Sequence, residues 1–250
     1  MKNLIVIFLI SLVFISCGKN QKTVESTKET TEESNEKSLN KNVSENSVNE
    51  GQNKSEVISD GIKILEFRKG DLNSDTKYKG NIVSGAKWID KNGENILIIS
   101  ETDVKNYLND GNEVTSKEIH AYCYVVTENK TQLLWDIVDF VKDCPLDMRV
   151  EFIPKSLSVT DINKNGIGEN TFLYALSCKG DVSPDDLKLM MHEGNVKYAL
   201  RGDTKIQYEI DGKTHSEGGE FKADNAFSSA PPGFLDYAKE QWSKFNIQKY

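Results

Sequence analysis

The sequence predicts a mainly β protein (α+β only at its edge), an antiparallel β-meander, sandwich- or barrel-like, with one C-terminal amphipathic helix. Three observations predict this fold class. Apolar and polar residues alternate with a period of two between residues 60 and 250, turns with Asn-Gly or Asp-Gly separate the alternating runs, and a helical period appears near the C-terminus.

The length and charge of the chain limit the function classes. Its 250 residues suffice for one domain and a tail, or for two small domains. It has 31 basic and 39 acidic residues, hence a formal charge of −8. Because a nucleic-acid-binding protein needs a clustered basic surface, we expect no nucleic-acid partner.

Residues 1–16 are typical of a secretory signal peptide, with a short positive start and an apolar run. The run from Leu4 to Ile15 would span about 18 Å as a helix, which is too short for a hydrocarbon core of about 30 Å. It ends in Ser16-Cys17, which resembles the lipobox of bacterial lipoproteins, although Phe14 departs from the usual Leu.

The lipobox resemblance implies cleavage before Cys17, a diacylglycerol on the Cys17 thiol and acylation of the new amine. Two or more acyl chains hold a protein on a bilayer, since each buried CH₂ contributes about 0.8 kcal/mol. The partner expected at Cys17 is therefore membrane lipid. An ordinary cleaved signal with a chance cysteine, or an uncleaved anchor, is the alternative.

Residues 17–59 are expected to be the lipidated Cys17 followed by a disordered polar tether. The segment contains no Phe, Trp or Tyr and consists mostly of Lys, Glu, Ser, Thr and Asn. Such a chain cannot bury enough apolar area to offset its ordering entropy. Its r.m.s. reach is about 35 Å, which suits a spacer between a membrane and a folded body.

Residues 60–250 are expected to form a single β-rich globular domain. The turn at 90–93 contains Asn92-Gly93, the strongest short signal for a hairpin. The runs on either side of the turns are rich in the β-branched and aromatic residues that favour strands. The expected strands are 81–89, 95–100, 118–127, 132–141, 157–161, 171–178, 187–192, 196–201 and 205–210.

Two features of this domain allow alternatives. The segment 187–192 could be helical because Ser183-Pro184 is typical of a helix start, but Gly194 closes a hairpin with the next run, so we expect a strand. The Lys-Asn-Gly of 91–93 recurs at 164–166. This repeat indicates one turn solution used twice rather than an internal duplication.

The C-terminal region differs from the rest of the domain. The prolines at 231 and 232 precede a segment in which apolar residues recur on one face of a helix, with charged residues opposite. The apolar face consists of Phe234, Leu235, Ala238, Trp242 and Phe245.

Three cysteines remain beside Cys17. Export to an oxidising compartment favours a disulfide. Cys123 lies within an apolar strand and is expected to be buried. Cys144 and Cys178 lie at strand ends near turns, so we expect a Cys144–Cys178 bridge, with three free thiols as the alternative.

The sharpest local motif begins at Asp161 and is a candidate calcium loop. Oxygen donors stand at its positions one, three, five and nine, and a glycine stands at position six, which permits a sharp turn around a hard cation. The spacing resembles the calcium loops of dockerins and FG-GAP repeats but lacks the Glu at position twelve of an EF-hand. A polar hairpin loop without metal is the alternative. The candidate ligands are Asp161, Asn163, Asn165 and Glu169.

Signals for catalysis are weak, and we lean against an enzyme. The chain has three histidines, none at metal-ligand spacing, and it has no G-x-S-x-G motif or Gly-rich phosphate loop. An acid/base pair of carboxylates remains open, since spatial separation defines such a pair. The carboxylates considered for it include Asp136, Asp139, Asp143 and Glu151.

A longer resemblance covers roughly residues 80–205. The chain there resembles an exported family of Bacteroidota-type bacteria labelled as surface polysaccharide biosynthesis proteins. The label implies a role at the cell surface without assigning catalytic residues. The runs that carry the resemblance are Trp88–Asn95, Asp161–Gly166, Cys178–Pro184, Lys188–Gly194 and Lys197–Gly202.

Together these features predict an exported bacterial lipoprotein that is anchored to a membrane. The outer membrane or cell surface is favoured over the inner membrane. Its β domain is expected to bind or scaffold at the cell envelope without catalysis, in surface polysaccharide assembly. Its expected partners beyond lipid are a surface glycan or an envelope protein, and Ca²⁺ is its one candidate cofactor. An envelope polysaccharide-acting enzyme with a carboxylate pair is the alternative.

Overall fold

The computed structural model describes residues 58–59, 61–127 and 130–248, and these form a mainly β structure with one α-helix. All of them belong to one compact unit, residues 52–250. The predicted signal peptide, Cys17 and most of the predicted tether lie outside the described residues. The predicted tether boundary at residue 59 differs from the structure, because Ile58–Ser59 already pairs as strand β1.

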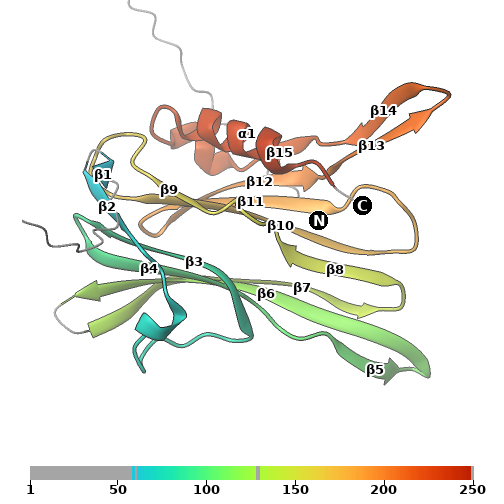
Figure 1. Cartoon of the computed structure of the whole chain (residues 1–250), viewed down its shortest axis with the longest axis horizontal. Coiled ribbons are helices and arrows are strands. Elements are labelled where there is room, and N and C mark those ends of the chain that lie inside the picture. Colours follow the sequence, from blue (N-terminus) through green and yellow to red (C-terminus); the bar gives the residue numbers. More distant parts are fainter. Residues whose placement is uncertain (1–57, 60, 128–129, 249–250) are drawn as a thin grey trace, which may run out of the picture. The chain divides into compact units, whose positions relative to one another are not determined.

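The first sheet has seven antiparallel strands in the order β1-β2-β3-β4-β6-β5, with β7 on the other side of β6 (Figure 1). Strand β6 pairs with β5 along its first residues and with β4 along its later residues. Because β4 pairs with β6 and not with β5, the strand order departs at this point from the predicted meander. The strands are β1 (Ile58–Ser59), β2 (Ile62–Leu65), β3 (Asn81–Asp90), β4 (Gly93–Glu101), β5 (Lys105–Asn109), β6 (Asn112–Thr127) and β7 (Lys130–Cys144).

The second sheet has six antiparallel strands in the order β15-β12-β11-β10-β8, with β9 also paired to β10. A separate hairpin consists of β13 (Lys205–Ile210) and β14 (Lys213–Gly218). The strands of the second sheet are β8 (Asp147–Phe152), β9 (Ser158–Thr160), β10 (Glu169–Lys179), β11 (Asp186–Glu193), β12 (Val196–Asp203) and β15 (Phe221–Ala223).

The two sheets pack face to face as a sandwich, and β10 lies at its centre (Figure 1). Side chains on a strand alternate between faces. Accordingly Phe172 and Tyr174 enter the core shared with the first sheet, whereas Leu173 and Ala175 enter the core on the opposite face. This double burial explains why Phe172–Leu176 of β10 is a continuous apolar run rather than an alternating one.

Helix α1 (Phe234–Phe245) covers the outer face of the second sheet (Figure 1). It follows Gly233, which has a φ of 91°. The predicted apolar face is confirmed, because Phe234, Ala238 and Trp242 are buried against the second sheet. The 3-10 helix η2 (Asn225–Ser229) adds Phe227 to the same core, whereas η1 (Lys69–Asp71) belongs to the connection from β2 to β3.

The structure contains more strands than the sequence predicted. The nine expected segments all contain strands, and 187–192 is a strand within β11 rather than a helix. Short or solvated strands such as β5 and β14 were missed because all of their residues are exposed, so burial imposes no alternation on their sequence. Within the described part of the chain, no helix has the length and apolar composition to cross a membrane.

Candidate functional site

The candidate calcium loop connects β9 to β10 and is folded by its own side chains. Asp161 Oδ2 accepts a hydrogen bond from the Gly166 N–H at 3.1 Å, across the loop. Asn163 Oδ1 accepts from the Asn165 N–H at 3.0 Å, and Asn165 Oδ1 accepts from the Ile167 N–H at 2.7 Å. The Gly at position six has a φ of 77°, so it makes the sharp turn that the motif predicted.

Two carboxylates of the loop are buried. Asp161 is 6% exposed and Glu169 is 0% exposed. Glu169 Oε2 accepts from Thr160 Oγ1 at 3.0 Å and from the Ile162 N–H at 2.9 Å, on either side of Asp161. The second oxygens, Asp161 Oδ1 and Glu169 Oε1, have no hydrogen-bond partner among the described residues. Burial raises the pKa of Glu169 to about 7.

Glu193 belongs to this site, although the sequence did not indicate it. It ends β11, directly opposite Glu169 in the antiparallel register. Its Oε1 accepts hydrogen bonds from Asn163 Nδ2 at 2.6 Å and from Asn165 Nδ2 at 2.7 Å. The only signal in the sequence was the expected hairpin of 187–192 with 196–201, which does not show which loop its turn contacts.

The β3–β4 turn packs against this loop. The Lys91 N–H donates to the Gly166 carbonyl at 2.9 Å, and Lys91 Nζ donates to the Asn165 carbonyl. Asp90 Oδ2 accepts both from Trp88 Nε1 at 3.0 Å and from the Gly168 N–H at 3.0 Å. The two Lys-Asn-Gly repeats of the sequence are therefore in contact with each other.

The structure thus brings Asp161, Asn163, Asn165 and Glu169 into one loop. In residues 58–59, 61–127 and 130–248, no three His, Cys, Asp or Glu side chains form a metal-binding group. A cation here would rely on two carboxylates together with neutral amide and carbonyl oxygens, which is a donor set that suits a hard cation. Calcium binding itself stays a prediction.

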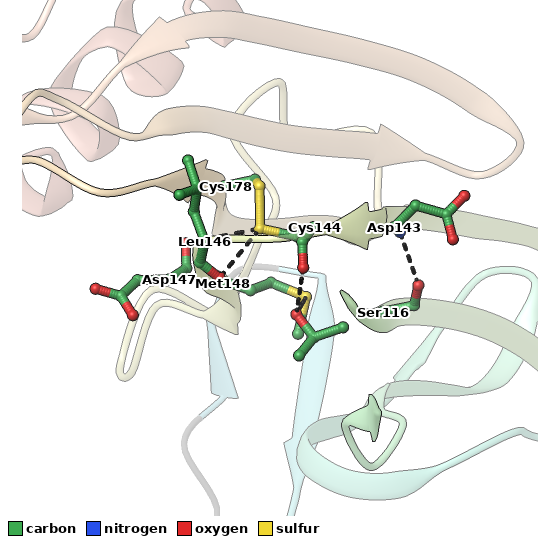
Figure 2. Close-up of a disulfide and its surroundings, with 8 residues drawn as sticks. Ser116, Asp143, Cys144, Leu146, Asp147, Met148 and Cys178 are labelled. Atoms are coloured by element: carbon green, nitrogen blue, oxygen red, sulfur yellow. Dashed lines mark hydrogen bonds between the residues drawn. A yellow bond between two sulfur atoms is a disulfide. The ribbon is translucent and has the colours of Figure 1, made fainter. Parts of the chain in front are cut away.

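The predicted cysteine pair lies at disulfide distance and joins the two sheets (Figure 2). Cys144, at the end of β7, and Cys178, near the end of β10, have a Cα–Cα distance of 5.7 Å. Closing a loop of this length contributes about 4 kcal/mol in the chain-entropy model. Beside it the Asp143 N–H donates to Ser116 Oγ at 3.0 Å (Figure 2).

Cys123, the cysteine expected to stay outside the disulfide, and His192 are both buried. Cys123 is a free cysteine in the inter-sheet core, as predicted, and burial raises the pKa of its thiol to about 12. His192 stacks on Trp135 with ring centroids 3.9 Å apart, so β11 contacts β7 directly. Burial, with a smaller effect of Lys197, lowers the pKa of His192 to about 3.

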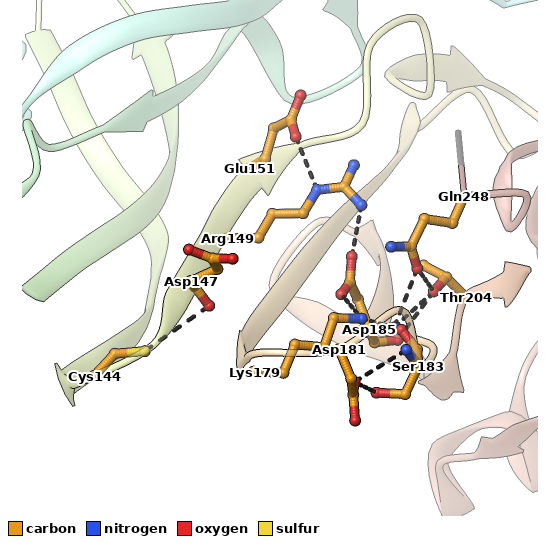
Figure 3. Close-up of polar contacts among 10 residues, drawn as sticks. All are labelled: Cys144, Asp147, Arg149, Glu151, Lys179, Asp181, Ser183, Asp185, Thr204 and Gln248. Carbon is orange, nitrogen blue, oxygen red and sulfur yellow. Dashed lines mark hydrogen bonds and ion pairs between the residues drawn. The ribbon is translucent and has the colours of Figure 1, made fainter. Parts of the chain in front are cut away.

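A buried ion-pair cluster surrounds Asp185 (Figure 3). Its carboxylate is 1% exposed and pairs with Arg149 at 2.6 Å and Lys179 at 2.5 Å. Burial alone would raise the pKa of Asp185, but hydrogen bonds from these two cations hold it below its ordinary value. The Asp185 N–H donates to Thr204 Oγ1 at 2.8 Å, and Thr204 Oγ1 donates to Gln248 Oε1 at 2.6 Å (Figure 3). The cluster thereby fastens the C-terminal segment to the second sheet.

An open pocket of about 370 Å³ lies over β5, β6 and β7. Its lining includes the rings of Tyr107 and Phe140, which are 38% and 55% exposed. The Tyr107 hydroxyl bonds to Ser116 Oγ of β6 at 2.8 Å and also donates to Asp143 of β7. These two contacts fix the position of the Tyr107 ring.

The same pocket is lined by lysines. Lys117 is engaged by Glu101 at 2.6 Å. Lys142 has only a 3.9 Å contact with Asp143, and its side chain is 68% exposed. Lys105 has no ion pair within the described part of the chain. The pocket therefore presents two aromatic rings together with two cationic groups, Lys105 and Lys142, whose ion pairs within the described residues are absent or long.

Three of the four carboxylates considered for an acid/base pair have other partners. Asp139 accepts from the Tyr174 hydroxyl at 2.9 Å and pairs with Lys188. Glu151 accepts from Arg149 at 2.9 Å, and Asp143 accepts from Tyr107. These contacts give each of the three groups a structural role.

His192 should make the protein sensitive to acid. Since its folded-state pKa lies below its unfolded value, its contribution to stability is lost as pH falls from about 6.5. Relative to His192→Gln, the wild type should lose up to about 1.4 kcal/mol for each pH unit below that value. Urea unfolding of both proteins at about pH 7 and about pH 4.5 measures the difference. Parallel pH profiles would show that the buried ring does not resist protonation.

Removing the charge of Asp185 should destabilise the fold strongly. Asp185→Asn removes the buried anion that Arg149 and Lys179 share and leaves Arg149 only the more exposed Glu151, at a cost of about 3–5 kcal/mol. Glu151→Gln is the matched control, because it removes the exposed partner of the same arginine and should cost less than about 1 kcal/mol. Equal losses in urea unfolding would contradict the assignment of Asp185 as the essential anion.

Comparison with protein-family models, with curated proteins and with solved structures finds no match for this chain. Its function is therefore argued from its own residues.

Proposed function

We propose that the protein is an exported, lipid-anchored envelope protein whose β domain binds an acidic surface glycan without catalysis. The pocket over β5, β6 and β7 carries this proposal. Apolar C–H faces of sugar rings pack well on aromatic rings such as Tyr107 and Phe140. Lys105 and Lys142 at the same pocket complement carboxylate groups on a polymer of uronic acids.

The export part of the proposal rests on two separate features, the N-terminal sequence and the cysteine pair of the β domain. The apolar run before Cys17 is typical of a lipoprotein signal. Disulfides persist in oxidising compartments, so the pair of Cys144 and Cys178 supports a location outside the cytoplasm. A pocket open to solvent on a tethered domain suits capture of a polymer near the membrane.

The volume and openness of the pocket suit binding more than reaction. A pocket of about 370 Å³ is at the small end of ligand sites and accommodates one or two sugar units of a chain. Its one lining carboxylate, Glu118, is held by Lys79 and by His120 at 2.8 Å. This engagement favours a binding role over general acid catalysis.

The glycan proposal is tested by binding of the purified chain to polygalacturonate and, for comparison, to neutral dextran. Phe140→Ala should weaken polygalacturonate binding about tenfold, because it removes the most exposed ring of the pocket. Lys142→Gln should weaken it less and reduce its salt dependence. Calorimetry or surface plasmon resonance measures both effects.

Val138→Ala is the matched control, since Val138 is exposed on the same face of β7 but does not line the pocket. It should leave the affinity unchanged. Equal binding of dextran, or equal effects of the Phe140 and Val138 variants, would refute a site at this pocket.

Anchoring is tested separately. Cys17→Ser removes the thiol that would carry the diacylglycerol, so the variant should leave the membrane fraction of its native host. Detergent partitioning and mass spectrometry of the mature N-terminus measure this. A variant that still fractionates with the membrane like the wild type would refute the lipid anchor.

A further inference from the structure

We propose that residues 161–169 form a calcium site in which Glu193, from the neighbouring strand, orients the two asparagine ligands. This inference is independent of the glycan pocket. It rests on two buried oxygens without partners and on the hydrogen bonds that surround them.

One carboxylate oxygen of Asp161, Oδ1, is buried without a hydrogen-bond partner among the described residues. Its sister oxygen Oδ2 accepts from the Gly166 N–H across the loop, so the carboxylate lies between the two arms. The carboxylate is nearly fully buried, and Oδ1 has no hydrogen-bond partner among the described residues. Leaving a buried acceptor without a partner costs about 1–3 kcal/mol, and more for a charged group. A cation in the loop would remove this cost.

Glu169 supplies a second buried oxygen, on a carboxylate that contacts both chain neighbours of Asp161. Its Oε2 is fixed by the Ile162 N–H and Thr160 Oγ1, the immediate neighbours of Asp161. Its Oε1 is buried and unpartnered among the described residues. The carboxylates of Asp161 and Glu169 therefore each keep one buried oxygen without a hydrogen-bond partner, and Gly166 makes the sharp turn in the loop that joins them.

Glu193 orients the two neutral ligands, Asn163 and Asn165. It accepts from the Nδ2 groups of both Asn163 and Asn165, which fixes the rotation of both amides. Their Oδ1 atoms then lie on the loop side, where each already meets a backbone N–H two residues ahead and keeps a second lone pair. Partners beyond the ligands tune metal affinity in this way. Glu193 is thus a positioning residue rather than a ligand.

A cationic side chain, Lys91, contacts the same loop. Lys91 donates to the Asn165 and Gly166 carbonyls through its Nζ and its N–H, and these are not the side-chain oxygens proposed as ligands. The donor set of carboxylate and amide oxygens suits Ca²⁺ better than Mg²⁺, which demands a near-ideal octahedron and keeps several waters. With two charged ligands, the affinity should resemble that of extracellular modules, with a Kd of about 0.1–1 mM.

The test is calorimetric titration of the EDTA-treated full chain with CaCl₂, and separately with MgCl₂. The wild type should bind one Ca²⁺ and show a higher unfolding midpoint in its presence. Asp161→Asn should abolish the heat. Glu193→Ala should weaken Ca²⁺ binding by about 10–100-fold, whereas Glu193→Gln keeps an acceptor for both amides and should retain more affinity.

Glu209→Ala is the control, since this glutamate is exposed on the separate β13–β14 hairpin. Unfolding of every variant in EDTA shows whether the variant folds. If Glu193→Ala does not fold, the calcium affinity of Glu193→Gln is compared with that of the wild type instead. Absence of calcium heat in the wild type at about ten times the expected Kd would overturn the site. Wild-type affinity in Glu193→Ala, or equal affinities in its Ala and Gln variants, would overturn the orienting role of Glu193.

Discussion

The structure depends on the apolar interior shared by the two sheets. β10 contributes to it with one face and to the helix-covered core with the other, so every residue from Glu169 to Leu176 is buried. Because the side-chain period of a strand is two, a slip of one residue would exchange the two faces. The register of β10 with β8, β9 and β11 therefore fixes where the loop before it and the cysteine near its end must lie.

The sheets are joined at both ends of β10. At its start, Asp90 bridges Trp88 and the Gly168 N–H, and a Cβ on Gly168 would meet Trp88 Nε1 at 2.5 Å. Near its end, the Cys144–Cys178 pair ties β10 to β7. A polar contact and a covalent one thus restrain the same pair of sheets, and the polar one holds the loop 161–168 against the β3–β4 turn.

The two proposed sites use this rigidity in different ways. The pocket lies on the first sheet, where Asp143, the neighbour of the disulfide cysteine Cys144, accepts from the Tyr107 hydroxyl and fixes that ring. The loop proposed to bind calcium lies on the second sheet, where Glu193 meets two amides because β11 pairs with β10. A ligand group held in advance by rigid strands loses less entropy on binding.

The sequence alone determined the local features: alternating strands, the apolar face of α1, the burial of Cys123 and the close spacing of the oxygen donors from Asp161 to Glu169. Each depends on residues near one another in the chain, where periodicity and turn chemistry act. Only the tertiary structure decided that Glu193 joins the loop, that Lys91 contacts the second Lys-Asn-Gly repeat, and that Phe140 and Tyr107 share a pocket. These contacts depend on sheet order and on packing between sheets, which link distant segments and leave no periodic signal in the sequence.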